Sequence, residues 1–434
     1  MNSGVGFEVP AALPADAGSA DGGSVGGAGV GSGRRRLRWL LDGLRVTLPA
    51  WVAGHVLVGL ISWHMDRQHP LGKLFMWDTP WYRYIAANGY DAKGGFAHFF
   101  PFTPMVAAAV TTVTRMPVTI ALFGVCWVGA LVFGALVHRI VIRETGDRAA
   151  ARRAAWLTQL APGAYALVMG YTEPLAGVLA AGYFLAIRAY PDRQARTWIA
   201  IILGFLSGIA RPTGLLLAIP GVVEGVRSAR AFGRRGAVST NTAAMQSAAM
   251  QSAAMQSAAM KSAAMKSAAM KSAAGKSLLS AAAPIAGLVA YLGYSRLRFH
   301  SWLLPFTQQT LKTNRARLIN SPRISFHDVS RLRYHGHQVA DMCLLLIVLA
   351  AVLIPIVARR LPACYVLWTL PMYGLAITSH NFTSLPRYLG ALFPILIAAA
   401  LVSRRWWQEA MLLGASVALL IWTTHTALAG FLVA

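Results

Sequence analysis

The sequence predicts an all-α integral membrane protein with about 10 to 12 membrane-spanning helices. Of its 434 residues, 56% are hydrophobic and only 13% are charged, and apolar runs recur along the whole chain. A soluble core cannot bury so many runs. The formal net charge of +25 comes from Lys and Arg residues that cluster in short loops between these runs. This pattern indicates membrane topology rather than a nucleic-acid-binding surface, so we expect membrane lipids and no nucleic acid as partners.

The N-terminal segment, residues 1–33, is rich in Gly, Ala and Ser and has no apolar run, so we interpret it as a disordered cytoplasmic tail. The basic cluster Arg34 to Arg38 follows and marks the cytoplasmic side of a first span, about Leu44 to Trp63. This orientation places the next loop, residues 64–97, on the external face. Residues 34–226 then form the N-terminal part of the membrane domain.

The first external loop carries an acid, Asp78, between Trp77 and Trp81 in the aromatic stretch that runs from Leu74 to Pro104. Apolar and aromatic residues recur there at steps of three and four, at Trp77, Trp81, Tyr84 and Ile85. This spacing predicts a short amphipathic helix. Trp and Tyr are typical of the membrane interface, so the Asp78 carboxylate is expected at the depth of lipid headgroups and their phosphates.

The next two apolar runs, Phe102–Val113 and Pro117–Ile142, follow each other closely. Whether one or both of them cross the membrane decides on which side the following loop lies. If both crossed, the arginine-rich loop 143–153 would lie outside, against the positive-inside tendency. The first run is only about a dozen residues long and begins between two prolines, which is typical of a re-entrant or interfacial segment. We therefore expect only the second run to cross.

The remaining apolar runs predict further spans that alternate between the two faces. They are Ala154–Gly170, Thr172–Ile187, the short pair Trp198–Ala210 and Thr213–Val226, then Leu278–Tyr294, Asp341–Ala358, Leu361–Thr378, Leu389–Val402 and Gln408–Leu432. Residues 278–434 thus form the C-terminal transmembrane part. It includes a long external loop, residues 295–340.

A basic low-complexity loop, residues 227–277, separates the two transmembrane parts. Residues 243–272 are six copies of a five-residue unit, AAMQS three times and AAMKS three times, and a variant AAGKS ends at Ser277. These residue types favour helix, but a period of five makes no consistent stripe on a helix of 3.6 residues per turn. We interpret the loop as a cytoplasmic insertion.

This topology brings polar motifs from distant parts of the chain to the external face. They are Trp77-Asp78, Gly170-Tyr171-Thr172-Glu173-Pro174, Ala210-Arg211-Pro212-Thr213-Gly214, and Ser379-His380-Asn381 with Pro386-Arg387-Tyr388. Ionisable groups at membrane depth are costly, so each motif is a candidate for a functional site. Their convergence at one face predicts a single site.

The residue types at this site fit transfer of a sugar from a lipid phosphate. Asp78 is placed to act as general base on an acceptor hydroxyl, like the base carboxylate of an inverting glycosidase. A phosphate leaving group departs already charged and needs cations, which Arg211 and Arg387 supply. The predicted catalytic residue is therefore Asp78, and the predicted substrate-binding residues are Trp77, Trp81, Tyr82, His98, Glu173, Arg211, His380, Arg387 and Tyr388.

No metal and no cofactor is expected at this site. The cysteines, Cys126, Cys343 and Cys364, all fall within apolar runs, where a cysteine is usually a small packing residue. We expect from them neither a disulfide nor a metal site.

Each site residue also has a purely structural interpretation. Asp78 stands at the start of the amphipathic helix and can cap it, and Glu173 can likewise cap a helix that begins at Pro174. Arg211 and Arg387 can mark helix ends or pair with Glu173 internally. The histidines are more often satisfied structural residues, and the aromatic side chains more often anchor a protein in the interface.

Taken together, these stretches resemble the PIG-V family, the GPI mannosyltransferase 2 group of membrane glycosyltransferases. The matching stretches, in the family's order, are WDTPWYRYIAANGY from Trp77, HFFPFTP from His98, GYTEP from Gly170, ARPTGLLL from Ala210 and LPRYLGALFP from Leu385. The high Ala, Gly and Arg content is typical of a GC-rich bacterium, so the resemblance is to a bacterial homologue.

The resemblance implies a GT-C fold and inverting transfer of mannose from polyprenyl-phosphate mannose, without a nucleotide sugar or a required metal. Asp78 matches the acidic residue of the family's first external loop. The acceptor is left open as a lipid, a glycan or a protein. The implied location is the cell membrane, crossed many times, with the active site on the extracytoplasmic side.

Two function classes follow from these observations. The first is an integral membrane mannosyltransferase that works on the external face of the cytoplasmic membrane. The alternative is a transporter or flippase of a lipid-linked sugar, in which the arginines line a path and no residue does chemistry. Transporters often contain inverted repeats with broken helices in corresponding halves, and this sequence shows no such internal symmetry. An inactive scaffold would leave the convergence of motifs unexplained.

Overall fold

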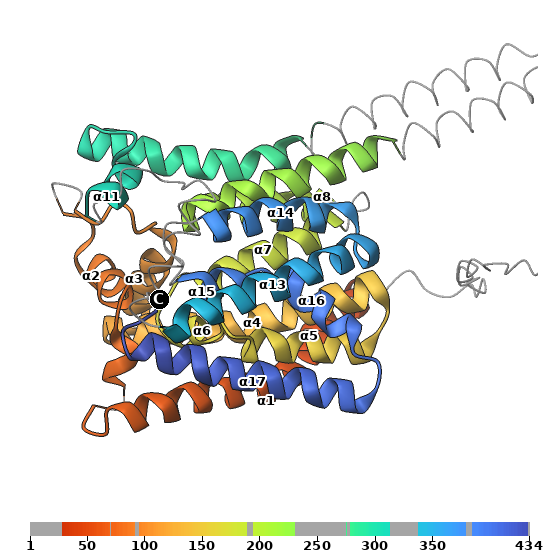
Figure 1. Cartoon of the computed structure of the whole chain (residues 1–434). Helices are drawn as coiled ribbons and strands as arrows, with labels where there is room; N and C mark the ends of the chain where they lie inside the picture. The colour runs from red at the N-terminus through yellow and green to blue at the C-terminus, as the bar shows by residue number, and fades with distance from the viewer. Residues whose placement is uncertain are drawn as a thin grey trace, which may run out of the picture. The chain divides into compact units, whose positions relative to one another are not determined.

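The computed structural model describes residues 28–69, 71–91, 95–188, 194–230, 275, 278–312, 337–378 and 384–432 (Figure 1). Every regular element in these ranges is a helix, which confirms the all-α prediction. The contacts divide the chain into a unit Met1–Trp39 and a unit Leu40–Ala434, and the candidate site lies within the second. Residues 1–27, nearly all of the repeat and His380 lie outside the described residues.

Five of the described helices are long and apolar enough to cross a membrane, so the chain is a multi-pass membrane protein. They are Arg38–Met65 of α1 (Ala28–Met65), α4 (Val118–Thr145), the helix Leu278–Phe299, α13 (His337–Arg360) and α17 (Trp406–Leu428). Four further apolar helices are shorter, namely α3 (Phe102–Thr114), α8 (Gln194–Ala210), α14 (Ala363–Thr378) and α16 (Phe393–Val402). The predicted number of 10 to 12 spans is larger than five because it counted short apolar runs, such as Trp198–Ala210 and Leu389–Val402, as spans.

The segment predicted to be re-entrant or interfacial forms α3, a helix of 13 residues. A helix of that length extends about 20 Å, which is short of the roughly 30 Å hydrocarbon core. It ends at Arg115, whose φ of 63° closes the helix with a left-handed residue. Its length therefore agrees with the expectation that this run does not cross by itself.

The run Ala154–Gly170 was predicted to be one outward span, and the structure differs there. It contains the end of α5 (Arg148–Leu160) and the one-turn α6 (Tyr165–Val168), separated by a turn at residues 161–164. The cause is Pro162, because a proline forces the preceding residue out of helical geometry, and Ala161 indeed has φ −62° and ψ 156°.

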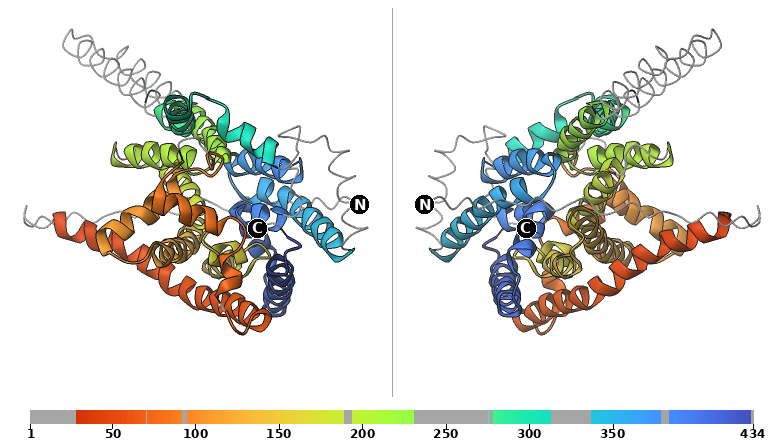
Figure 2. Two further views of the ribbon diagram at one scale, coloured as in Figure 1. Left: turned by 90° about the vertical axis from the view of Figure 1, so that its left-hand side faces the viewer. Right: turned by 90° about the vertical axis from the view of Figure 1, so that its right-hand side faces the viewer.

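The helix α4 lies at the centre of the packing within this unit. It contacts α3, α5 and α7 (Glu173–Arg188), while α7 also packs on α8, and α16 packs on α5 and α13. Several of these helices are seen nearly end-on in Figure 2. Buried Phe133, Phe184 and Phe393 meet where α4, α7 and α16 come together.

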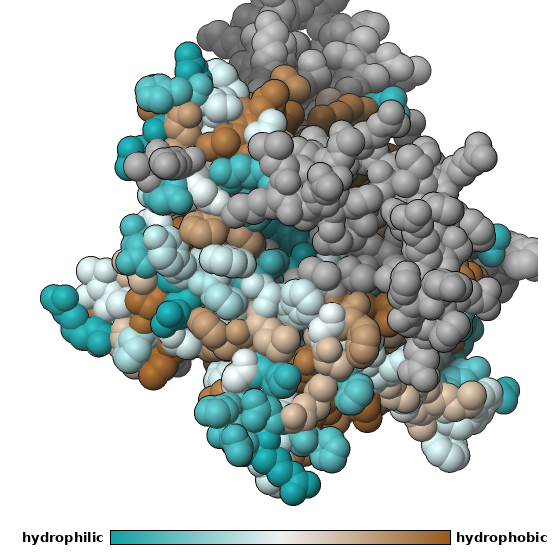
Figure 3. All heavy atoms as spheres, turned by 60° about the vertical axis from the view of Figure 1, so that its left-hand side comes forward, coloured by the Kyte–Doolittle hydropathy of each residue, from teal (hydrophilic) through white to brown (hydrophobic). Residues whose placement is uncertain are grey.

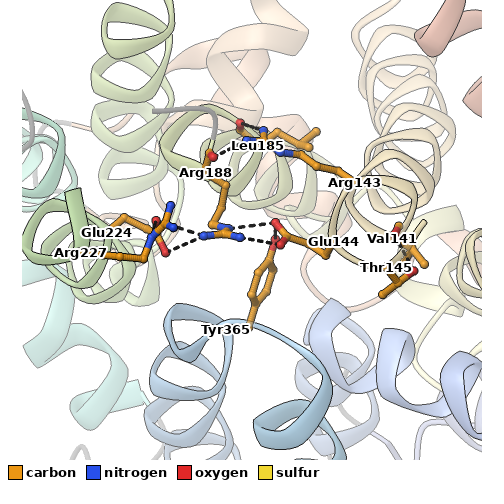
Figure 4. A network of polar contacts seen from close by, with 9 residues as sticks. All are labelled: Val141, Arg143, Glu144, Thr145, Leu185, Arg188, Glu224, Arg227 and Tyr365. Atoms are coloured by element: carbon orange, nitrogen blue, oxygen red, sulfur yellow. Dashed lines mark hydrogen bonds and ion pairs between the residues drawn. The ribbon is translucent and has the colours of Figure 1, made fainter. Parts of the chain in front are cut away.

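A polar network ties together the helix ends at the far end of α7 from Glu173 (Figure 4). Arg188 pairs with Glu144 at 2.7 Å and with Glu224 at 3.2 Å. Glu224 also pairs with Arg227 at 2.7 Å, and the Tyr365 hydroxyl donates to Glu144 at 3.2 Å. The 16 residues of α7 extend about 24 Å, so charged groups gather at both ends of this helix.

The short helix α15 (Leu385–Gly390) is held in place by a close backbone approach to the turn at residues 161–164. A Cβ added to Gly163 would lie 2.0 Å from the Pro386 carbonyl oxygen and 3.2 Å from the Arg387 Cα. A Cβ added to Gly390 would lie 3.0 Å from the Gly163 Cα. Only glycine fits at position 163, and this contact sets the position of Arg387.

We expect Gly163→Ala to destabilise the protein by about 1–3 kcal/mol, because the new methyl group must push α15 away. The thermal unfolding midpoint in detergent measures this loss. The control is Gly124→Ala in α4, where an added Cβ has no heavy atom within 4 Å and alanine is the better helix former. Equal midpoints for Gly163→Ala and the wild type would contradict the close approach.

Candidate functional site

Asp78 occupies the N-cap position of α2 (Thr79–Asn88), the short amphipathic helix predicted for this loop, but its side chain makes no capping hydrogen bond. Its Oδ2 instead accepts a hydrogen bond from Arg387 Nη1 at 2.9 Å, across 309 residues of sequence. The Asp78 side chain keeps 26% of its surface exposed. The carboxylate is therefore engaged on one side and accessible on the other, and the capping interpretation does not describe it.

Glu173 begins α7 and is almost completely buried, with 3% of its side chain exposed. Its Oε1 accepts a hydrogen bond from Arg211 Nη1 at 2.9 Å and lies 3.2 Å from Arg387 Nε. Its Oε2 is buried and has no hydrogen-bond partner among the described residues. Of the interpretations left open for the two arginines, internal pairing with Glu173 is what the structure contains.

The guanidinium of Arg387 has aromatic neighbours as well as its acidic partners. Besides its two acidic partners, Nη2 lies 3.4 Å from the Tyr388 hydroxyl. The ring centroids of Tyr171 and Tyr388 lie 5.4 Å and 5.1 Å from its Cζ, within the range of cation–π attraction. Arg387 therefore serves as the hub between Asp78 and Glu173.

Arg211 directly precedes the 3₁₀ helix η2 (Pro212–Leu217) and is more accessible than Arg387. Its side chain keeps 17% exposure against 10% for Arg387. Within the described residues its ion pair uses one nitrogen, Nη1, on Glu173, and its Cζ lies 5.8 Å from the Tyr388 ring centroid. Arg211 thus has donor groups to spare beside the accessible carboxylate of Asp78.

The four charged residues, Asp78, Glu173, Arg211 and Arg387, form one cluster with no net charge, which we call the four-charge cluster. They come from the starts of α2, α7 and η2 and from α15. Burying single charges is expensive, whereas two acids and two arginines in contact offset one another. The cluster is therefore stable only when all four elements are in place.

Burial raises the pKa of the Asp78 carboxyl above its ordinary value of 3.8, and the positive charge of Arg387 opposes this rise. For Arg387, burial alone would lower the pKa, but the negative charges of Glu173 and Asp78 outweigh it and raise the pKa well above its ordinary value. Asp78 is thus a stronger base than a solvated aspartate, and its partner stays a cation.

The predicted aromatic residues surround Asp78 in different environments. Tyr82 is buried and meets Phe99 edge-on, with ring centroids 5.2 Å apart. Trp81 is 42% exposed and stacks on Phe96 at 4.8 Å. Figure 3 shows that hydrophilic and apolar patches lie side by side on the face of the molecule that it draws. Sugar contact by these rings stays a prediction.

The structure describes one of the two predicted histidines, His98. His98 Nδ1 lies 3.4 Å from Gln308 Oε1, on α11 (Leu304–Lys312), and is half-buried. This contact links the first external loop to the start of the predicted loop 295–340. His380 is outside the described residues, so its proposed role stays a prediction.

Sequence reasoning did not assign a role to Tyr171, Tyr165 or Thr79, which are fully buried near the four-charge cluster. Their hydroxyls have no hydrogen-bond partner among the described residues. Tyr171 lies beside the Arg387 guanidinium, and its place in the GYTEP stretch, two residues before Glu173, was a usable signal. Tyr165 lies in α6 and had no comparable signal.

No protein family model matches the sequence, and no curated protein matches it. Two solved structures from Archaeoglobus fulgidus are similar to it. One is the oligosaccharyltransferase AglB in complex with an inhibitory peptide and a dolichol-phosphate, with 14% identity and a TM-score of 0.42 over 87% of this chain and 55% of that chain. The other is the oligosaccharyltransferase complex with Zn and sulfate, with 15% identity and a TM-score of 0.42 over 88% of this chain and 53% of that one. The present chain thus spans about half of their length.

We expect Glu173→Gln to destabilise the protein by about 3–5 kcal/mol, because two largely buried arginines lose a shared, almost completely buried carboxylate. Thermal unfolding in detergent measures the effect. The control is Asp66→Asn, which removes the charge of an acid whose partners, on His69, lie at the surface. A surface pair of that kind contributes about 0–1 kcal/mol. Equal losses in both variants would show that Glu173 has no central role.

Proposed function

We propose that this protein is a membrane glycosyltransferase that moves mannose from polyprenyl-phosphate mannose to a lipid, glycan or protein acceptor on the external face of the membrane. The observation that carries the proposal is the Asp78 carboxylate, which is partly exposed while Arg387 holds its other side at 2.9 Å. Mannose and the GT-C fold come from the motif resemblance described above.

Asp78 is the proposed general base. Its accessible oxygen takes the proton of the acceptor hydroxyl while that hydroxyl oxygen attacks the anomeric carbon of the sugar. The bond between that carbon and the phosphate oxygen breaks, and its electron pair leaves with the phosphate. Attack from the face opposite to the leaving group inverts the anomeric carbon.

The two arginines divide the remaining work in this proposal. Arg387 is engaged by Asp78, Glu173 and Tyr388, so its task is to hold the base. Arg211 uses Nη1 on Glu173, and its remaining donors are the proposed contact for the departing phosphate. A planar guanidinium suits this task because it can bind two phosphate oxygens at once.

Asp78→Asn is expected to lower mannose transfer by about 10²–10⁴-fold, because the amide keeps the shape of the side chain and cannot take the proton. Membranes with wild type or variant are given radiolabelled polyprenyl-phosphate mannose, and label in lipid, glycan and protein is counted. Asp66→Asn, another acid near the predicted external face, should transfer normally. Equal transfer by Asp78→Asn and the wild type would remove Asp78 as the base. No transfer by either would favour the transporter or flippase.

The pH dependence should follow the protonation of Asp78. Only the carboxylate form can accept a proton, so transfer is lost as pH falls through the pKa of Asp78, which lies above its ordinary value. Arg387→Gln removes the cation that lowers this pKa, so the acid limb of the rate should move to higher pH. Arg211→Gln should move it less, because the charge of Arg211 acts on Asp78 more weakly. Identical acid limbs in wild type and Arg387→Gln would contradict this coupling.

A further inference from the structure

Trp77, directly before Asp78, has a left-handed backbone with φ 60°. This conformation is uncommon for a bulky side chain and is strained. Such a conformation persists only where the surrounding structure determines it. Because the backbone of Trp77 sets the direction in which the chain enters Asp78, it also sets where the carboxylate points.

The contact that holds Trp77 is a hydrogen bond to the last turn of α17. Its indole Nε1 donates to the Ala427 carbonyl oxygen at 3.1 Å, across 350 residues of sequence. The Ala427 carbonyl oxygen also accepts the backbone N–H of Gly430 at 3.2 Å, and its second lone pair is available to the indole. The ring itself is half-buried against the apolar core.

The helix α17 is in turn fastened to the turn at residues 161–164. Thr423 donates from its hydroxyl to the Pro162 carbonyl, and Ser416 donates to the Leu160 carbonyl at 2.9 Å. The same turn positions Arg387, through the close approach of Gly163 to Pro386. The turn at residues 161–164 is thus connected to both members of the ion pair. It is connected to Asp78 through α17 and Trp77, and to Arg387 through α15.

We propose that Trp77 is the positioning residue of the base: its indole N–H, tied to α17, keeps the backbone left-handed and so holds the Asp78 carboxylate against Arg387. The inference rests on the proposed function, in which Asp78 takes the acceptor proton. It gives Trp77 a task other than stacking on the sugar. Removing the N–H lets the backbone relax and moves the base, while the donor site at Arg211 is unchanged.

The test compares kcat and the KM for polyprenyl-phosphate mannose in Trp77→Phe, which keeps the ring and lacks the donor. Misplacing a catalytic group by about 1 Å costs up to about 10²-fold, so we expect kcat to fall by about 10–10²-fold with KM unchanged. The matched control is Trp51→Phe, since Trp51 Nε1 also donates to a carbonyl, that of Trp127, at 2.9 Å, but this bond joins α1 to α4 and does not involve the chain that enters Asp78. Trp51→Phe should leave both constants unchanged.

A second comparison tests the backbone directly. Glycine adopts a positive φ without steric cost, so Trp77→Gly should keep more kcat than Trp77→Ala. At a residue with a negative φ we expect the alanine variant to keep more activity than the glycine variant, because alanine fills more space and restricts the unfolded chain more. This comparison decides the matter if Trp77→Phe is not recovered in folded form.

The outcomes separate this inference from the proposed function. If the wild type transfers no mannose, or Asp78→Asn transfers as well as the wild type, the proposed function is overturned and the inference with it. If Asp78→Asn is inactive but Trp77→Phe has the wild-type kcat, only the positioning role is overturned. A raised KM at unchanged kcat would make Trp77 a substrate contact, and Trp77→Ala matching or exceeding Trp77→Gly would also overturn the inference.

Discussion

Glu173 shares one carboxylate oxygen between Arg211 and Arg387, at 2.9 Å and 3.2 Å, and the candidate site is built around this interaction. At 3% exposure it is the most deeply buried charge of the cluster. A buried carboxylate requires cations, and the two cations it recruits require a further acid, which Asp78 supplies. This requirement brings together the starts of α2, α7 and η2 with α15, although these elements are far apart in the sequence.

The network at the other end of α7 shows what distinguishes the four-charge cluster. There, Glu144 and Glu224 are 5% and 4% exposed, and each contacts Arg188 and a second partner. Such saturated pairs join helix ends and leave no carboxylate accessible. Asp78, by contrast, has a single ion-pair partner among the described residues and keeps a quarter of its side chain exposed. Because of this difference in accessibility, we interpret the four-charge cluster as a candidate site and the Arg188 network as a purely structural connection between helices.

The turn at residues 161–164 connects the stability of the fold to the geometry of the site. Pro162 breaks the helix, Gly163 lets α15 approach, and the Pro162 carbonyl receives Thr423 of α17. A broken helix at this depth leaves backbone groups that need partners, and side chains from α17 provide them. The distance between Asp78 and Arg387 thus depends on backbone packing outside the ion pair itself.

The sequence by itself determined that this is an all-α membrane protein, and it singled out the four charged residues that the structure brings into contact. Apolar runs, loop charges and aromatic spacing carry the all-α membrane architecture, the short α3 and the amphipathic α2, because these depend on local composition and period. The ionisable motifs were recognisable because charges at membrane depth are rare and costly. Only the tertiary structure decided which ion pairs and hydrogen bonds those side chains form. That Arg387 joins Asp78 to Glu173, that Asp78 does not cap its helix and that Trp77 reaches Ala427 depend on contacts hundreds of residues apart, which no local pattern encodes.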